Sequence, residues 1–104
     1  NAASAKFLKE KRGVARRFMK AYHESIEWVY ANPDKSTAFY ASFNKTSPEN
    51  AKQTIEAFPK PAVAPWPVKG LKQNLEEAVQ NKQLAKPMPE AEAEKLLYDF
   101  VYRP

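Results

Sequence analysis

The sequence predicts an all-α protein of about five helices. Its apolar residues recur at intervals of three and four along most of the chain, which is the spacing of one face of a helix. Only two glycines are present, and no short alternating run of β-branched residues is bounded by an Asn-Gly type of turn, so β-hairpins are not expected. Because 43% of the 104 residues are hydrophobic, we expect one folded structural unit overall.

The segment 5–58 is predicted to form three helices, after a disordered start at 1–4 that we interpret as the remnant of a tag. The first helix is expected over about Ala5 to Ala31. Glycine weakens a helix interior by roughly 1 kcal/mol relative to alanine, so a bend is expected near Arg12 and Gly13. The expected inward residues of this helix are Ala15, Phe18, Met19, Tyr22, Ile26, Val29 and Tyr30.

The other two helices of this segment start at the tripeptides Asn32-Pro33-Asp34 and Ser47-Pro48-Glu49. Asparagine and serine cap helices, proline suits the first helical position, and a carboxylate favours the positive end of the helix dipole. The second helix is therefore expected over about Pro33 to Phe43, and the third is expected to end at about Phe58. Their expected inward residues are Ala38, Phe39 and Phe43 in the second, and Ala51, Ile55 and Phe58 in the third.

Residues 59–67 are predicted to be a proline-rich linker, and residues 68–104 the C-terminal helices. Four prolines in the linker fix φ and push the preceding residues toward extended conformations. Beyond it, helices are expected over about Val68 to Asn81 and about Pro89 to Phe100, with a break between them. Leu71, Leu75, Ala78 and Val79 recur at helical spacing in the first of these helices, and Leu96, Leu97 and Phe100 require cover in the second.

The net charge of +5 raises the possibility of a nucleic-acid partner. Lys9, Arg12, Arg16 and Lys20 fall on one face of a continuous first helix. The opposite face carries the apolar residues, and an amphipathic helix normally has a charged outer side for solubility alone. We therefore favour a solvated face and expect no nucleic-acid partner, while a basic helical module that binds nucleic acid stays open as an alternative function.

The sequence contains no constellation typical of a catalytic or metal site. His23 and Glu27 are four residues apart on one helix, but two ligands do not make a metal site and no cysteine is present. No serine has the glycine-flanked turn of a nucleophile elbow, and the isolated Gly13 and Gly70 do not form a phosphate-binding loop. We predict a protein that is not an enzyme, with no catalytic residues, metal or cofactor.

Trp66 is the one candidate for ligand contact. It stands between Pro65 and Pro67, and aromatic side chains beside proline often take part in recognition. The favoured interpretation is that Trp66 covers the helices as a lid. A helical adaptor that recognises a protein through Trp66 and its prolines is a second alternative function.

Four short sequence segments, in a fixed order along the chain, are similar to segments of a known protein family. They are Val14-Ala15-Arg16-Arg17-Phe18-Met19-Lys20-Ala21-Tyr22 after a Phe7-Leu8 turn, Ser25-Ile26-Glu27-Trp28-Val29-Tyr30-Ala31-Asn32-Pro33-Asp34-Lys35, Thr46-Ser47-Pro48-Glu49, and Leu71 to Val79 continuing to Lys86-Pro87. Together they resemble the C-terminal segment of periplasmic substrate-binding proteins of the nitrate, sulfonate, taurine and thiamine-precursor family, which are receptors of ABC importers. The second phrase is the most specific, and the resemblance covers the chain from Phe7 to Met88.

The resemblance implies that this chain is a fragment of a two-lobed, type II periplasmic-binding-protein fold. The parent receptor would lie in the periplasm, close over a small and often anionic solute, and deliver it to an inner-membrane ABC permease. Most ligand contacts in such receptors come from other segments, so no residue here inherits a binding role. We accordingly expect a scaffold segment without catalysis. Because its apolar faces lack the rest of the receptor, we expect the isolated chain to self-associate.

Overall fold

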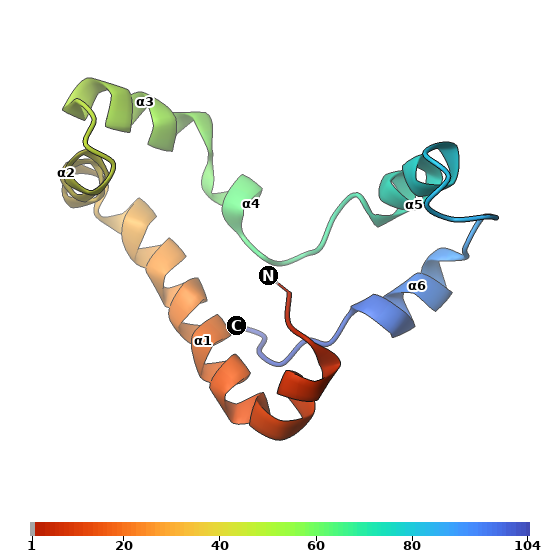
Figure 1. Ribbon diagram of the computed structural model, residues 1–104. Coiled ribbons are helices and arrows are strands. Elements are labelled where there is room, and N and C mark those ends of the chain that lie inside the picture. Colours follow the sequence, from red (N-terminus) through yellow and green to blue (C-terminus); the bar gives the residue numbers. More distant parts are fainter. Residues whose placement is uncertain (1) are drawn as a thin grey trace. The chain divides into compact units, whose positions relative to one another are not determined.

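The computed structural model describes residues 2–104 and is all-helical, with no strand among these residues (Figure 1). The helices are α1 (Ala5–Ala31), α2 (Pro33–Phe43), α3 (Pro48–Ala57), α4 (Lys60–Val63), α5 (Leu71–Gln80) and α6 (Glu90–Leu97). The predicted all-α class is confirmed. The number of helices is six because α4, a single turn, forms inside the segment that was predicted to be only a linker. No helix of the described residues has the length and hydropathy needed to cross a membrane.

The chain divides into two compact units. The first comprises the residues up to Pro65 together with Val101–Pro104, and so contains α1 to α4. The second comprises Trp66–Phe100 and contains α5 and α6.

Helix α1 begins at a serine cap and bends early. The Ser4 hydroxyl accepts a hydrogen bond from the Phe7 amide at 3.2 Å, which satisfies one of the free amides of the first turn. The predicted bend is present but lies at Lys11, whose φ of −133° and ψ of 38° are not helical. Gly13 is itself helical, so the bend does not depend on glycine at that position.

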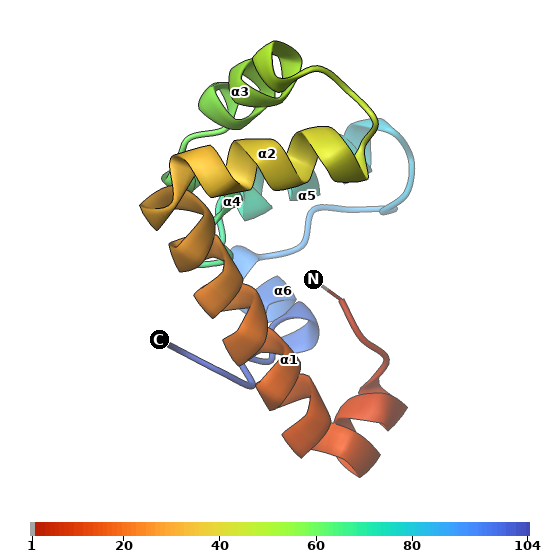
Figure 2. The same cartoon turned by 90° about the vertical axis from the view of Figure 1, so that its left-hand side faces the viewer.

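The predicted starts of α2 and α3 agree with the structure. Helix α2 follows Asn32 directly with Pro33 in its first turn. At the start of α3, the Ser47 hydroxyl accepts a hydrogen bond from the Asn50 amide at 3.2 Å, and Pro48 occupies the first turn. Figures 1 and 2 both place α3 beside α2. Asn32 makes no side-chain capping hydrogen bond to α2, so the predicted asparagine cap is wrong, whereas the predicted serine cap of α3 is confirmed.

The predicted inward face of α2 is wrong. Ala38, Phe39 and Phe43 are exposed, and the buried residues of this helix are Ser36 and Ala41. The small side chain of Ala41 lies on the side where α3 packs, and α3 contributes Ala51, which is 0% exposed. Small residues let two helix backbones approach closely, so the contact forms without the phenylalanines.

The core of the first unit is small. Its buried apolar residues are Ala15, Ile26, Ala41 and Ala51, and no large side chain among residues 2–104 is fully buried. Phe18 and Phe58, which were expected to face inward, are exposed, while Met19, Tyr22 and Ile55 are half-buried. The first unit therefore holds its helices together mainly through alanines.

The second unit pairs α5 with α6. Helix α5 starts later than predicted because Gly70, with φ of 82°, lies in the left-handed region and ends any helix begun at Val68. Helix α6 is shorter than predicted and ends at Leu97, leaving Leu96 and Leu97 exposed instead of covered. Ala93 is the buried apolar residue of this unit.

We predict that Ala51→Leu destabilises the first unit. The added methylene groups have no space at a fully buried position, and overpacking of this kind costs about 1–3 kcal/mol in the free energy of unfolding. Urea unfolding followed by far-ultraviolet circular dichroism measures the change. Ala57→Leu is the control, because Ala57 is exposed on the same helix and the same substitution there is expected to change stability by less than about 0.5 kcal/mol. Equal effects of the two substitutions would contradict the packing described for α2 and α3.

Candidate functional site

An exposed aromatic face extends across α1 and α2. It consists of Trp28 on α1 with Phe39 and Phe43 on α2, which are 48%, 66% and 74% exposed; we call these three residues the aromatic face. The rings of Phe39 and Phe43 stack one helical turn apart, with centroids 5.8 Å apart and planes inclined by 14°. Single exposed apolar residues are common on proteins, but a continuous cluster of large ones typically marks an interaction surface.

The junction between α1 and α2 positions this face. The backbone amide and the side-chain amide of Asn32 both donate to the Trp28 carbonyl oxygen at 3.0 Å, which closes the end of α1. The buried Ser36 hydroxyl lies 2.8 Å from the carbonyl oxygens of Val29 and Asn32 and donates to them. These contacts hold the first turn of α2 against the end of α1. Phe39 and Phe43, three and seven residues after Ser36, lie on the same side of α2 but are exposed.

A hollow of about 570 Å³ lies beside the aromatic face. Its lining residues come from the second half of α1 and from α2: Ala21, Glu24, Ser25, Trp28, Val29 and Phe39. Most of the lining is apolar, and Glu24 is its charged member. The hollow is thus suited to an apolar side chain with a cation nearby, and it offers no set of polar groups that would hold a small solute.

Two contacts tie α1 to the chain that follows α3. The Lys60 ammonium group donates to Glu27 Oε2 at 2.6 Å, and the Tyr30 hydroxyl donates to the Phe58 carbonyl oxygen. The hydrogen bond from Lys60 is the main cause that lowers the pKa of Glu27 below its ordinary value. Desolvation opposes it, and the electrostatic interactions of Glu27 with Lys60 and His23 lower the pKa by smaller amounts. This ion pair joins residues 33 positions apart and fixes α4 against α1.

The structure adds no third ligand to His23 and Glu27. The ring of His23 lies against Tyr102, with centroids 6.2 Å apart, and Glu27 is engaged by Lys60. Among residues 2–104, no group of three His, Cys, Asp or Glu side chains is placed to hold a metal ion.

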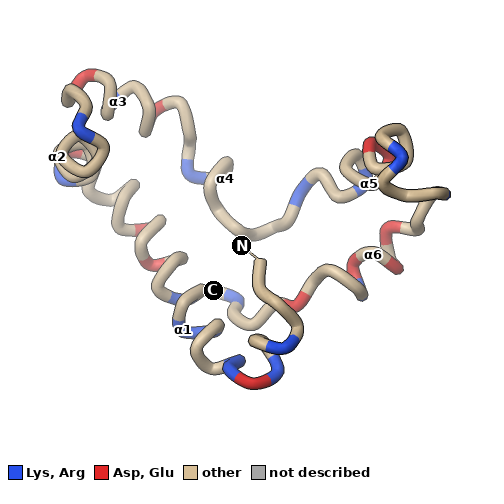
Figure 3. The backbone as a smooth tube through the Cα atoms, in the orientation of Figure 1, with Lys and Arg blue, Asp and Glu red and all other residues tan. Residues whose placement is uncertain are grey.

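The basic residues of α1 do not form one continuous stripe. The bend at Lys11 separates Lys9 from Arg16 and Lys20, so the common face expected for a continuous helix is interrupted. Lys20 also forms an ion pair with Glu24 at 3.8 Å. Figure 3 shows acidic segments interleaved with basic ones along α1. Exposed basic and acidic side chains that alternate along a helix in this way are typical of a helix face in contact with solvent.

Trp66, the candidate for ligand contact, is half-buried at the start of the second unit. Within that unit a second hollow lies along α5 and the chain leading to α6, and its lining includes Lys72, Leu75, Glu76, Val79, Met88 and Glu90. Trp66 is not among the residues that line it. Sequence analysis missed Ser36 and Lys60, whose contacts hold α2 and α4 against α1. It also missed the exposure of the aromatic face.

We predict that Lys60→Met raises the pKa of Glu27 toward its ordinary value, because the hydrogen bond and the positive charge are both removed. Since the pKa of Glu27 is lowered in the folded chain, the pair stabilises the fold at neutral pH and this contribution is lost as the pH falls through the pKa of Glu27. A nuclear magnetic resonance titration of the Glu27 carboxyl carbon measures the pKa, and urea unfolding at several pH values measures the stability. Lys52→Met is the control, because Lys52 pairs with Glu56. This substitution is expected to leave the pKa of Glu27 unchanged. An unchanged Glu27 titration in Lys60→Met would contradict the ion pair.

Comparison with known proteins identifies no relative of this chain. No family model, curated protein or solved structure matches it. Its function is accordingly inferred from its own residues.

Proposed function

We propose that this chain is a scaffold segment from the C-terminal part of a solute-binding receptor of an ABC importer. The resemblance of the phrase from Ser25 to Lys35 to the nitrate, sulfonate, taurine and thiamine-precursor receptors supports this. In the structure the phrase spans the last part of α1, the Asn32 junction and the first residues of α2. The family-like residues thus include those that set the orientation of two helices, which is a scaffold role and requires no chemistry from them.

The exposed aromatic face is the observation that carries the proposal. A folded domain normally places its largest apolar side chains inside, yet here alanines are buried while Phe39 and Phe43 are exposed. Leu96 and Leu97 of the second unit are exposed in the same way. Such an arrangement is expected when helices cover another part of a protein, and in the proposed receptor that part is one of the two α/β lobes.

In this proposal the parent receptor is periplasmic, binds a small solute between its lobes and docks on an inner-membrane permease. The present residues contribute no catalytic group and no assigned ligand contact. Their contribution is to cover apolar surface of a lobe and so to stabilise it, since burial of apolar area yields roughly 25 cal/mol per Å².

The reading frame that encodes this chain tests the proposal. We expect it to contain a secretory leader and βα units upstream of these residues. Calorimetric titration of its purified product with nitrate, taurine, an alkanesulfonate and an aminopyrimidine is then expected to show one-to-one binding of one of them. A reading frame confined to these residues, whose product folds as a monomer with its own cleft, would falsify the proposal.

A second prediction concerns the coverage of the apolar faces. The 104-residue chain is expected to enhance the fluorescence of the apolar dye ANS strongly, because Phe39, Phe43 and Leu97 are exposed. The complete reading-frame product is expected to enhance it much less at equal molar concentration, because its lobe covers these residues. Equal enhancement by the two proteins would count against the scaffold role.

A further inference from the structure

The aromatic face lies beside an open, mostly apolar hollow on the same surface. Phe43 is the most exposed large apolar residue of the described chain, at the end of α2. The hollow, lined by Trp28 and Phe39, is open and apolar, and its volume exceeds that of a phenylalanine ring. Phe39 contacts Phe43 and also lines the hollow, so the projecting ring and the hollow are neighbours on one surface.

We propose that this surface binds a second copy of the same chain, with Phe43 of each copy inserted into the hollow of the other. A two-fold axis makes such an exchange reciprocal, because one self-complementary surface then serves both copies. An aromatic ring in an apolar recess is the usual energetic centre of a protein interface. This inference concerns the 104-residue chain and does not depend on the receptor proposal.

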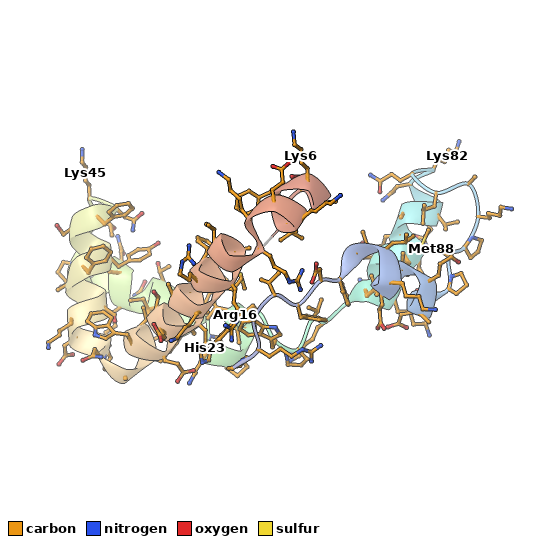
Figure 4. The ribbon with its side chains drawn as sticks, turned by 90° about the horizontal axis from the view of Figure 1, so that it is seen from below. Lys6, Arg16, His23, Lys45, Lys82 and Met88 are labelled. Carbon is orange, nitrogen blue, oxygen red and sulfur yellow. The ribbon has the colours of Figure 1, made fainter. Side chains whose placement is uncertain are left out.

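Charge complementarity identifies the second copy as the occupant. Lys45 follows Phe43 by two residues, just beyond α2, and its side chain projects away from the helices in Figure 4. Glu24 is the charged residue of the hollow. When Phe43 enters the hollow, Lys45 of the same copy is brought near Glu24 of the other, and the two-fold axis repeats the pair. Glu24 has a 3.8 Å contact with Lys20 on its own helix, and both of these side chains are largely exposed, so Glu24 remains accessible.

The size of the aromatic face determines the strength of the pairing. With about 200 Å² for a fully exposed aromatic side chain, the exposed parts of the three rings amount to roughly 380 Å² per copy. A stable interface takes about 800 Å² per partner. The pairing is therefore weak and depends on concentration. The net charge of +5 on each chain opposes the pairing.

Sedimentation equilibrium of the chain over a range of concentrations tests the pairing. We expect a monomer–dimer equilibrium that Phe43→Glu weakens at least about tenfold, as for loss of an interface centre. Leu97→Glu is the matched control, because Leu97 is similarly exposed, lies in the second unit and receives the same charge change. It is expected to leave the equilibrium unchanged. Circular dichroism of each variant verifies that the helices are intact.

A charge exchange tests the geometry independently of Phe43. Glu24→Lys and Lys45→Glu are each expected to weaken pairing about 2–5-fold for each ion pair lost, as for surface ion pairs, and the double variant is expected to restore it. A chain that stays monomeric at every concentration would overturn the inference. So would dimerisation that Leu97→Glu weakens as much as Phe43→Glu does, or a double variant that is no better than either single one. None of these outcomes bears on the receptor proposal, which is tested separately by the reading frame that encodes the chain.

Discussion

The Ser36 hydroxyl, buried between α1 and α2, holds the start of α2 against the end of α1. It donates to the carbonyl oxygens of Val29 and Asn32, and the Asn32 carbonyl oxygen also accepts from the Ser36 amide at 2.9 Å. A buried hydroxyl without a partner costs about 1–3 kcal/mol, so rotation of α2 away from this position is opposed. Phe39 and Phe43 lie on the same side of α2 as Ser36, about one and two helical turns further along, where their side chains are exposed.

The starts of α2 and α3 could be predicted from the sequence because they depend on local chemistry. Proline occupies the first turn of both helices and the Ser47 hydroxyl caps α3, as the tripeptide signals indicate. The Ser4 hydroxyl that caps α1 was not predicted, because it lies in the segment 1–4 that was expected to be disordered. The bend in α1 was predicted near Arg12 and Gly13 and lies at the adjacent residue, Lys11. A helix start involves neighbouring residues only, so a short window of sequence contains the necessary information.

The face that each helix buries could not be predicted in the same way. Hydrophobicity favoured Phe39 and Phe43 as the inner residues of α2, whereas the contact with α3 uses Ala41 and Ala51. Periodicity identifies an apolar face but not the partner that covers it. The ion pair between Glu27 and Lys60 was missed for a related reason. The two residues are 33 positions apart, and no local signal connects them.

A small alanine core and a large exposed apolar surface together imply that the fold gains stability from whatever covers it. A partner that binds only the folded chain stabilises it in proportion to the logarithm of the partner's concentration relative to the dissociation constant. A lobe in the same polypeptide acts at a high effective concentration, while a second copy acts only at its bulk concentration. Covering by a lobe and pairing of two copies use the same aromatic face, so they exclude one another. In the proposed receptor the tethered lobe would cover this face, and the proposed pairing would be confined to the separate chain.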